Sequence, residues 1–346
     1  MTRLITGTGS YLPQKEVSND ELLHYVKNFD AERAGASLDE WIRSHYGVAT
    51  RHWAREDEST GDMATVAARR ALDDAGLKPR DIDLIVMATA TSDHLAPHSV
   101  SAVQAALECD AVFHQIQAAC PGFLEALMVA DSLMANIGYR RALVLAGDKM
   151  THICDKRDFR MIGLFADAAG GVVLEDVPLE GDFGMQGFYA GSCGSKGYVL
   201  RVPAGGSRRP ISAERLAAGE HFLISEFKEV YTFAVETTAR CVNEACKRAG
   251  ISVDAVDWLI PHHASKNIIV DSLAQCGVPQ DKVVMSIEHT GNTSSGSVPT
   301  ALDEAARAGR FSPGDNLVLL ALGAGLGWGS TVYRWCDPAV ARAARR

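Results

Sequence analysis

The chain has 346 residues, a formal net charge of −9, and 47% hydrophobic and 22% charged residues. This composition is that of a globular protein long enough for two similar halves, and its acidity argues against a nucleic-acid-binding surface. No apolar stretch approaches the roughly 20 residues that span a bilayer, and the N-terminal residues lack a signal-peptide pattern, so we expect a cytoplasmic protein with neither membrane nor nucleic acid as partner.

Two segments of the chain share one pattern. Residues 67–91 and 239–265 each contain an amphipathic helix that ends at Gly76 or Gly250, then a short acidic connection and an apolar strand. In each half we then expect a short strand, a helix and a final apolar strand. In the first half, the short strand is expected at 112–119, the helix from Pro121 and the final strand at 142–148. In the second half, the same elements are expected at 283–288, from about Ser297 and at 316–322.

This repetition predicts an α/β protein made of two βαβαβ units whose sheets stack around shared central helices. The segment between them is rich in Gly, Ser and Pro. We therefore expect an N-terminal half at 1–176 that carries the nucleophile, a connecting segment at 177–224, and a C-terminal half at 225–346. In open α/β sheets the chemistry usually occurs at the strand ends, which here face one cleft.

Cys120 stands where the strand predicted at 112–119 meets a helix whose apolar residues begin at Leu124. Pro121 suits the first turn of that helix, where its missing N–H costs nothing. The free N–H groups and the dipole of a helix N-terminus stabilise a thiolate, so we expect a lowered pKa for the Cys120 thiol. A cysteine on an apolar stretch can also be a small buried hydrophobic residue, and for Cys120 alone both interpretations stand.

Polar groups follow two strands of the second half. His262 and His263 come directly after the apolar strand that ends at Pro261, so one imidazole can point into the cleft. Residues 291–296, GNTSSG, form a polar loop before the next helix, although turns and helix N-caps prefer the same residues. Because these segments and Cys120 fall at equivalent strand ends, we expect them to converge.

The glycine-rich run at 323–329 lacks the G-x-G-x-x-G spacing of a dinucleotide site, and a strand-like segment follows it where a helix would be needed. We expect this run to bring a backbone N–H close to the Cys120 thiol, as a donor to an oxyanion. The eight cysteines contain no C-x-x-C pair, so we expect reduced thiols, most of them packing residues, with no zinc site and no disulfide framework.

In their order along the chain, these motifs resemble those of the thiolase superfamily, and specifically of its β-ketoacyl-[acyl carrier protein] synthase III (ketosynthase III) branch. The resemblance covers nearly the whole chain and implies the thiolase fold, an α/β fold whose duplicated βαβαβ halves form five layers, αβαβα. It rests on Cys120-x-Gly-Phe, Pro-His262-x-Ala, Gly-Asn292-Thr-Ser and Gly-x-Gly-x-x-Trp328-Gly-Ser.

The resemblance implies a condensing enzyme that needs no metal or organic cofactor. An acyl group is loaded on Cys120 and then condensed, with decarboxylation, with a malonyl (or β-ketoacyl) thioester on acyl carrier protein. The backbone N–H groups of Cys120 and Ala324 hold the oxyanion, while His262 and Asn292 donate to the carbonyl oxygen of the extender. Two neutral donors stabilise an enolate without protonating it, so Asn292 favours carbon–carbon bond formation. His263 is the less favoured imidazole.

Positions that bind coenzyme A in the family differ in this chain. Family members primed by acyl-coenzyme A typically stack the adenine between a tryptophan and an arginine and hold phosphates with further arginines. The corresponding substrate-binding positions here are Trp41, His45, Phe159 and Asn267. The loss of guanidinium groups weakens phosphate recognition, so delivery of the acyl group on a carrier protein is favoured over coenzyme A thioesters.

Other positions bear on specificity and partners. Ser265 replaces an asparagine that usually follows the catalytic histidine, and Leu322 replaces an aromatic residue beside the malonyl site, which suggests a specialised synthase of secondary metabolism. The family implies a homodimer, in which Leu95 reaches the partner's acyl pocket. Lys228 and Lys266 offer a surface for an acidic carrier protein, although both can be ordinary solvated charges.

Three alternatives stay open. An acyltransferase would move the Cys-bound acyl group to a hydroxyl or an amine, and Asn292 argues against it. Condensation of two long acyl chains would need a second tunnel. A non-catalytic partner subunit would not need to keep Cys120, His262 and Asn292 together.

Overall fold

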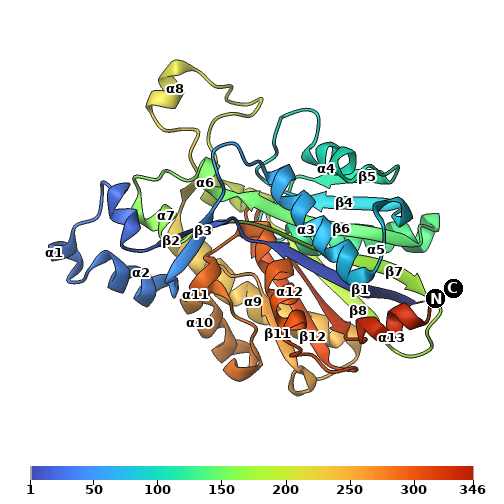
Figure 1. The fold of residues 1–346 in the computed structure, drawn as a ribbon. Helices are drawn as coiled ribbons and strands as arrows, with labels where there is room; N and C mark the ends of the chain where they lie inside the picture. Colours follow the sequence, from blue (N-terminus) through green and yellow to red (C-terminus); the bar gives the residue numbers. More distant parts are fainter. Residues whose placement is uncertain (1, 346) are drawn as a thin grey trace.

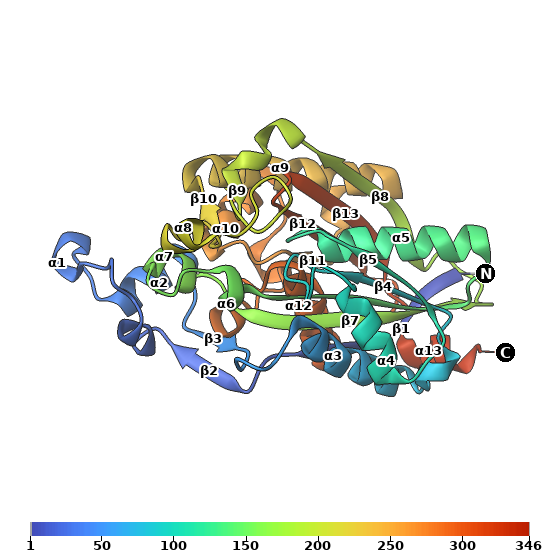
Figure 2. The ribbon, with the colours of Figure 1, turned by 90° about the horizontal axis from the view of Figure 1, so that it is seen from above.

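The computed structural model describes residues 2–345, which form two stacked β-sheets with helices between them and on both outer faces (Figures 1 and 2). The first sheet has the order β1 (Thr2–Tyr11), β7 (Asp167–Val177), β6 (Arg141–Lys149), β4 (Leu84–Ala88) and β5 (Val112–Ile116). The second has the order β11 (Trp258–Pro261), β12 (Asn316–Gly323), β13 (Gly327–Arg334) and β8 (Gly184–Ser192).

Six helices complete a five-layered arrangement. Helices α5 (Gly122–Ile137) and α12 (Ser297–Arg307) lie between the two sheets. The outer layers are α3 (Thr60–Ala75) with α4 (Ser99–Leu107) on the first sheet, and α9 (Phe227–Ala249) with α10 (Lys266–Cys276) on the second. The stacked sheets around shared central helices, predicted from the duplicated pattern, and the αβαβα layers implied by the family resemblance are therefore confirmed.

The two halves repeat one strand arrangement. In the first, β4 pairs in parallel with β6, which pairs antiparallel with β7. In the second, β11 pairs in parallel with β12, which pairs antiparallel with β13. The strand expected at 283–288 is wrong: only Val283 forms a bridge, to Leu259, because the chain turns into helix α11 (Ile287–Thr290).

Local sequence explains the main elements. Helices α3 and α9 both end at a glycine in the left-handed region, Gly76 at φ 65° and Gly250 at φ 69°, which residues with a Cβ rarely adopt. The central layer is dense in small residues, such as Ala126 on α5 and Ala301 on α12, and both are fully buried. Small side chains let two helices fit between the sheets with strand ends of both halves close together.

Most of the smaller elements lie at one end of the layers, whereas the last helix of the list below packs on β1 near the two termini, at the other end (Figure 1). The smaller elements are β2 (Lys15–Ser18), α1 (Ala31–Ala34), α2 (Leu38–Tyr46), β3 (Thr50–Trp53), α6 (Met150–Ile153), α7 (Phe159–Ile162), β9 (Leu200–Arg201), α8 (Ala213–Ala217), β10 (Ile224–Ser225) and α13 (Pro338–Ala343). The excursion that carries α8 projects at the top of Figure 1. Strand β8 pairs with β13, so part of the segment at 177–224 lies in the second sheet, and the predicted division at 176/177 and 224/225 stays a prediction.

Within residues 2–345, no helix is long and apolar enough to cross a membrane, and no group of three or more His, Cys, Asp or Glu side chains is arranged to hold a metal ion. All eight cysteines are free, and seven of them are buried, as predicted for packing thiols.

Candidate active site

Cys120 lies at the start of the central helix α5, where the first sheet faces the second. Its side chain is 6% exposed, and Pro121 is the N-cap of the helix. A Cβ on the next residue, Gly122, would lie 2.8 Å from the Cβ of Ala88 on β4. Glycine is needed there because the helix start packs directly on the end of the strand.

The Cys120 sulfur has three polar neighbours. Its own backbone N–H and that of Ala324 hydrogen-bond the sulfur, and the Ser294 hydroxyl lies 3.8 Å away. Burial nevertheless raises the pKa of the thiol to about 12, and the nearby Asp148 carboxylate adds to this. The lowered pKa predicted from the helix end is therefore wrong for the free protein, because desolvation of a thiolate outweighs the backbone donors.

Gly323 allows the approach of Ala324. A Cβ at residue 323 would lie 2.6 Å from the Cβ of Cys120 and 2.9 Å from its sulfur. Both distances are shorter than carbon and sulfur atoms tolerate, so any larger residue would push β12 away from the thiol. The glycine-rich run thus brings one backbone N–H to the sulfur, and its role as a donor to an oxyanion stays a prediction.

His262 follows β11 and is 5% exposed. Its Nδ1 lies 3.2 Å from the hydroxyl oxygen of Ser297, the first residue of α12. Burial lowers the pKa of the imidazole to about 3, and the adjacent His263 contributes to this. The imidazole is therefore neutral at physiological pH. His263 instead contacts Val284 and Ser286, and it does not line the cavity described below.

Asn292 is 3% exposed and has a fixed amide orientation. Its Oδ1 accepts a hydrogen bond of 2.9 Å from the backbone N–H of Ser294, and its Nδ2 donates to the carbonyl of Ala264 at 3.3 Å. The backbone of Asn292 is tied to Leu164 and Ala166 by two hydrogen bonds of 2.9 Å. Because the oxygen is occupied, the amide presents its second N–H as a donor.

The three predicted residues line one cavity of about 480 Å³, whose walls are mainly apolar. Trp41, His45, Ser265, Asn267 and Leu322, also predicted from the sequence, line the same cavity. Ser265 additionally caps helix α10, because its hydroxyl accepts from the backbone N–H of Ile268 at 3.3 Å.

The apolar wall along α9 was not predicted. It is formed by Phe227, Val230, Tyr231, Phe233 and Ala234, four of which fall at the helical spacing of one inward face. Amphipathic spacing in the first turns of this helix was the available signal.

Asp148, a lone carboxylate at the end of the apolar strand β6, was not predicted either. Its side chain is fully buried. It accepts hydrogen bonds from the backbone N–H of Ser295 at 3.0 Å and from the Ser295 hydroxyl at 2.7 Å.

Aromatic rings pack together near the cavity mouth. Trp41 stacks on His45 with a centroid distance of 4.0 Å and an interplanar angle of 11°, and meets Phe159 edge-on at 4.8 Å. Phe159 does not line the cavity itself but supports Trp41 from α7. Arg160, on the same helix, does line it.

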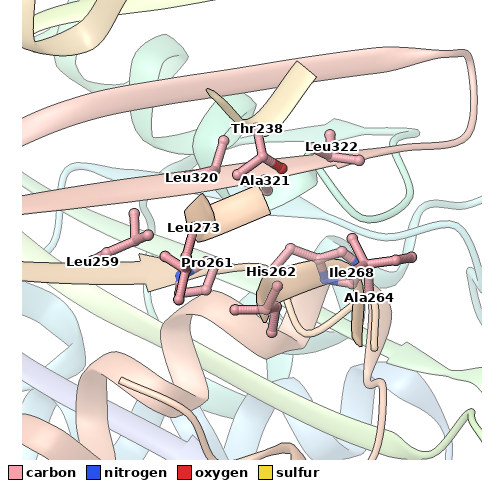
Figure 3. A pocket seen from close by; sticks show the side chains of 11 residues that line it. Thr238, Leu259, Pro261, His262, Ala264, Ile268, Leu273, Leu320, Ala321 and Leu322 are labelled. Atoms are coloured by element: carbon pink, nitrogen blue, oxygen red, sulfur yellow. The ribbon is translucent and has the colours of Figure 1, made fainter. Parts of the chain in front are cut away.

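A second pocket of about 20 Å³ adjoins the cavity (Figure 3). The two share His262, Ala264, Ile268 and Leu322 as walls. Thr238 of α9 lies on the same side as Leu322, across from the other three (Figure 3). This volume is about that of one water or one methyl group.

Three other predicted residues do not line the cavity. Leu95 is 92% exposed on the loop between β4 and α4. Lys228 and Lys266 are exposed at the starts of α9 and α10, and neither forms a salt bridge with another residue of the described range 2–345.

Comparisons with known proteins agree with this geometry. Residues 114–194 match the family described as 3-oxoacyl-[acyl-carrier-protein (ACP)] synthase III, and residues 246–335 match its C-terminal family. A β-ketoacyl-[acyl-carrier-protein] synthase III of Caldanaerobacter subterraneus subsp. tengcongensis is 38% identical over 332 residues, which are 96% of this chain and 97% of that protein.

Solved structures are similar along the whole fold. The 3-oxoacyl-(acyl carrier protein) synthase III of Pseudomonas aeruginosa PAO1 has a TM-score of 0.85 and 33% identity, covering 97% of this chain and 98% of that one. The priming β-ketosynthase of the R1128 polyketide biosynthetic pathway has a TM-score of 0.87 and 31% identity, covering 97% of each chain.

Proposed function

This chain belongs to the 3-oxoacyl-[acyl-carrier-protein] synthase III family of acyl-transferring condensing enzymes, and from that premise we propose which of its residues perform the reaction. The observation that carries the proposal is the convergence of Cys120, His262 and Asn292 on one mainly apolar cavity, with two backbone N–H groups on the Cys120 sulfur.

In the first half-reaction, Cys120 attacks the carbonyl carbon of an acyl thioester. The new bond joins that carbon to the Cys120 sulfur, the bond to the donor's sulfur breaks, and the thiol proton leaves with the departing thiol. The backbone N–H groups of Cys120 and Ala324 are placed to stabilise the oxyanion of the tetrahedral intermediate. Because burial raises the pKa of the Cys120 thiol to about 12 in the unacylated enzyme, this thiol loses its proton during the attack rather than before it.

In the second half-reaction, a malonyl thioester places its carbonyl oxygen against His262 and Asn292. Carbon dioxide leaves, the resulting enolate attacks the acyl carbon, and the Cys120 thiolate is expelled and reprotonated. The neutral imidazole and the fixed amide supply hydrogen bonds without a proton that would quench the carbanion. A β-ketoacyl extender would use the same donors.

We propose an acyl carrier protein as the preferred donor of the primer. Trp41 already stacks on His45 with one face and packs at a steep angle against Phe159, so these two contacts occupy ring surface that an adenine would need for stacking. The exposed ammonium groups of Lys228 and Lys266 offer an acidic carrier two partners. Coenzyme A thioesters are the competing donor class.

We also propose that the enzyme is a cytoplasmic homodimer. Strand β5 lies at the edge of the first sheet, where Val112 is 45% exposed, and Leu95 projects from the loop after β4. An unpaired edge strand beside exposed apolar side chains is a surface suited to a second copy. Eight free cysteines fit a reducing compartment.

The alternatives have less support. Transfer of the acyl group to a hydroxyl or amine would profit from a base in place of Asn292. Condensation of two long acyl chains would need space for a second alkyl chain, and the pocket next to His262, at about 20 Å³, is far smaller than such a chain. A specialised role, such as priming a secondary pathway, is supported by the likeness to the R1128 enzyme and by Leu322 in the cavity wall. If deletion of the gene caused a general defect in fatty-acid initiation, that role would be excluded.

The test is intact-mass spectrometry after incubation with a panel of acyl groups, each presented on coenzyme A and on carrier protein. An acyl adduct that is absent from Cys120→Ser and Cys120→Ala supports Cys120 as the acceptor and identifies the better donor. If no donor gives an adduct, the non-catalytic subunit becomes the preferred interpretation.

A further inference from the structure

Ser297 is a buried residue in contact with the catalytic imidazole. It is 1% exposed, stands first in helix α12, and its hydroxyl oxygen lies 3.2 Å from Nδ1 of His262. The Thr293 hydroxyl donates to that same oxygen at 3.3 Å. Ser297 does not line the cavity, so it can act on the reaction only through His262.

We propose that Ser297 is a positioning residue: its hydroxyl donates to Nδ1 of His262 and so keeps the imidazole proton on Nε2, toward the substrate. A neutral imidazole has one N–H donor and one acceptor nitrogen, and the partner of one nitrogen decides which is protonated. The inference rests on the proposed condensation, which needs an N–H donor from His262.

Proton counting supports this direction of the hydrogen bond. The hydroxyl of Ser297 has one proton and two acceptors within reach, Nδ1 of His262 and the carbonyl of Ser294 at 3.0 Å. That carbonyl already accepts the backbone N–H of Ser297. The carbonyl is therefore satisfied without the hydroxyl proton, which is left for Nδ1. The same carbonyl also faces the imidazole, so in the opposite tautomer the imidazole would donate to it, and nitrogen-15 NMR separates the two arrangements.

The same loop orients both donors to the extender. The backbone N–H of Ser294 occupies Oδ1 of Asn292 and turns its amide N–H outward, and Ser297 does the equivalent for the imidazole. The short segment at 292–297 thus sets two N–H groups for one carbonyl oxygen. The acylation of Cys120 uses backbone N–H groups instead, so Ser297 matters for the second half-reaction alone.

Ser297→Ala tests this division, with Thr300→Val as its matched control. Thr300 is on the same helix, is 1% exposed, and its hydroxyl has no hydrogen-bond partner in the described chain, so its removal leaves the site unchanged. We expect Ser297→Ala to acylate Cys120 at the wild-type rate but to lose about ten- to a hundredfold in decarboxylative condensation. Ser297→Thr, which keeps the hydroxyl, should recover most of the loss.

Nitrogen-15 NMR of histidine-labelled wild-type enzyme tests the tautomer directly, with the His262 signals identified by their absence from His262→Asn. Protonated Nε2 and unprotonated Nδ1 support the proposal, even if Ser297→Ala does not fold. Protonated Nδ1, or equal losses in both half-reactions of a folded Ser297→Ala, overturns it. If wild-type enzyme forms no acyl-Cys120 at all, the proposed function fails, and that result is distinct from a wrong tautomer.

Discussion

Gly323→Ala is the substitution that tests the oxyanion site most sharply. The added methyl group would lie 2.6 Å from the Cβ of Cys120 and 2.9 Å from its sulfur, where relaxed contacts need about 3.5–4.0 Å. The end of β12 must therefore retreat by about 1 Å, and the Ala324 N–H moves with it. Loss of one oxyanion donor costs about a hundred- to a thousandfold in rate, and the overpacking costs about 1–3 kcal/mol of stability.

The assay is the rate of Cys120 acylation, followed by rapid quenching and intact-mass spectrometry, together with thermal unfolding of the same preparation. Gly194→Ala is the control, because a Cβ at residue 194 meets no atom within 4 Å and its backbone is not in the left-handed region. A folded Gly323→Ala enzyme that acylates as fast as wild type would refute the account of how Ala324 reaches the thiol.

Three further predictions concern the same site. Asn292→Asp should keep acylation of the nucleophile but lose about a hundredfold or more in condensation, measured as carbon dioxide release, because a carboxylate repels the enolate; equal carbon dioxide release would contradict this. Asp148→Asn should lower the free energy of unfolding in urea by about 3 kcal/mol, because the NH2 group of the new side chain would face N–H and O–H donors, including those of Ser295. A change below about 1 kcal/mol would count against this. Burial lowers the pKa values of His262 and His263 to about 3 and about 4, from an ordinary 6.5, so the unfolded chain binds protons first as the pH falls. The stability that these groups contribute should be complete well above pH 6.5 and should fall as the pH drops from 6.5 towards about 4, by up to about 1.4 kcal/mol per pH unit for each imidazole. A flat urea midpoint between pH 6.5 and 5, the upper part of that range, would exclude buried neutral imidazoles.

Patterns local in sequence predicted much of the fold. The two matched segments predicted the stacked halves because helix periodicity, terminal glycines and apolar strands are read from neighbouring residues. The strand expected at 283–288 failed because pairing with β11 depends on where the chain turns, and it turns into α11 after Ser286. Short apolar segments do not settle that choice by themselves.

The convergence of Cys120, His262 and Asn292 followed from their places at strand ends, whereas the properties that depend on surrounding atoms did not follow. The pKa of the thiol was expected to fall, but burial raises it, and so does Asp148, which is near the thiol in space although it belongs to a later strand of the sequence. Phe159 was expected in the substrate site and instead supports Trp41. Burial and contacts between distant segments decide these properties, and the spacing of residues along one chain does not contain them.

The measurement that tests the central claim most directly is a single turnover with isolated acyl-enzyme. Acyl-Cys120 enzyme, freed of donor, would be mixed with malonyl-carrier protein labelled with carbon-13 in the malonyl group, and the carrier protein analysed by mass. The account predicts one carbon dioxide and one β-ketoacyl-carrier protein for each acyl-Cys120 consumed. Loss of the acyl group to water, a hydroxyl or an amine without carbon dioxide release would contradict it.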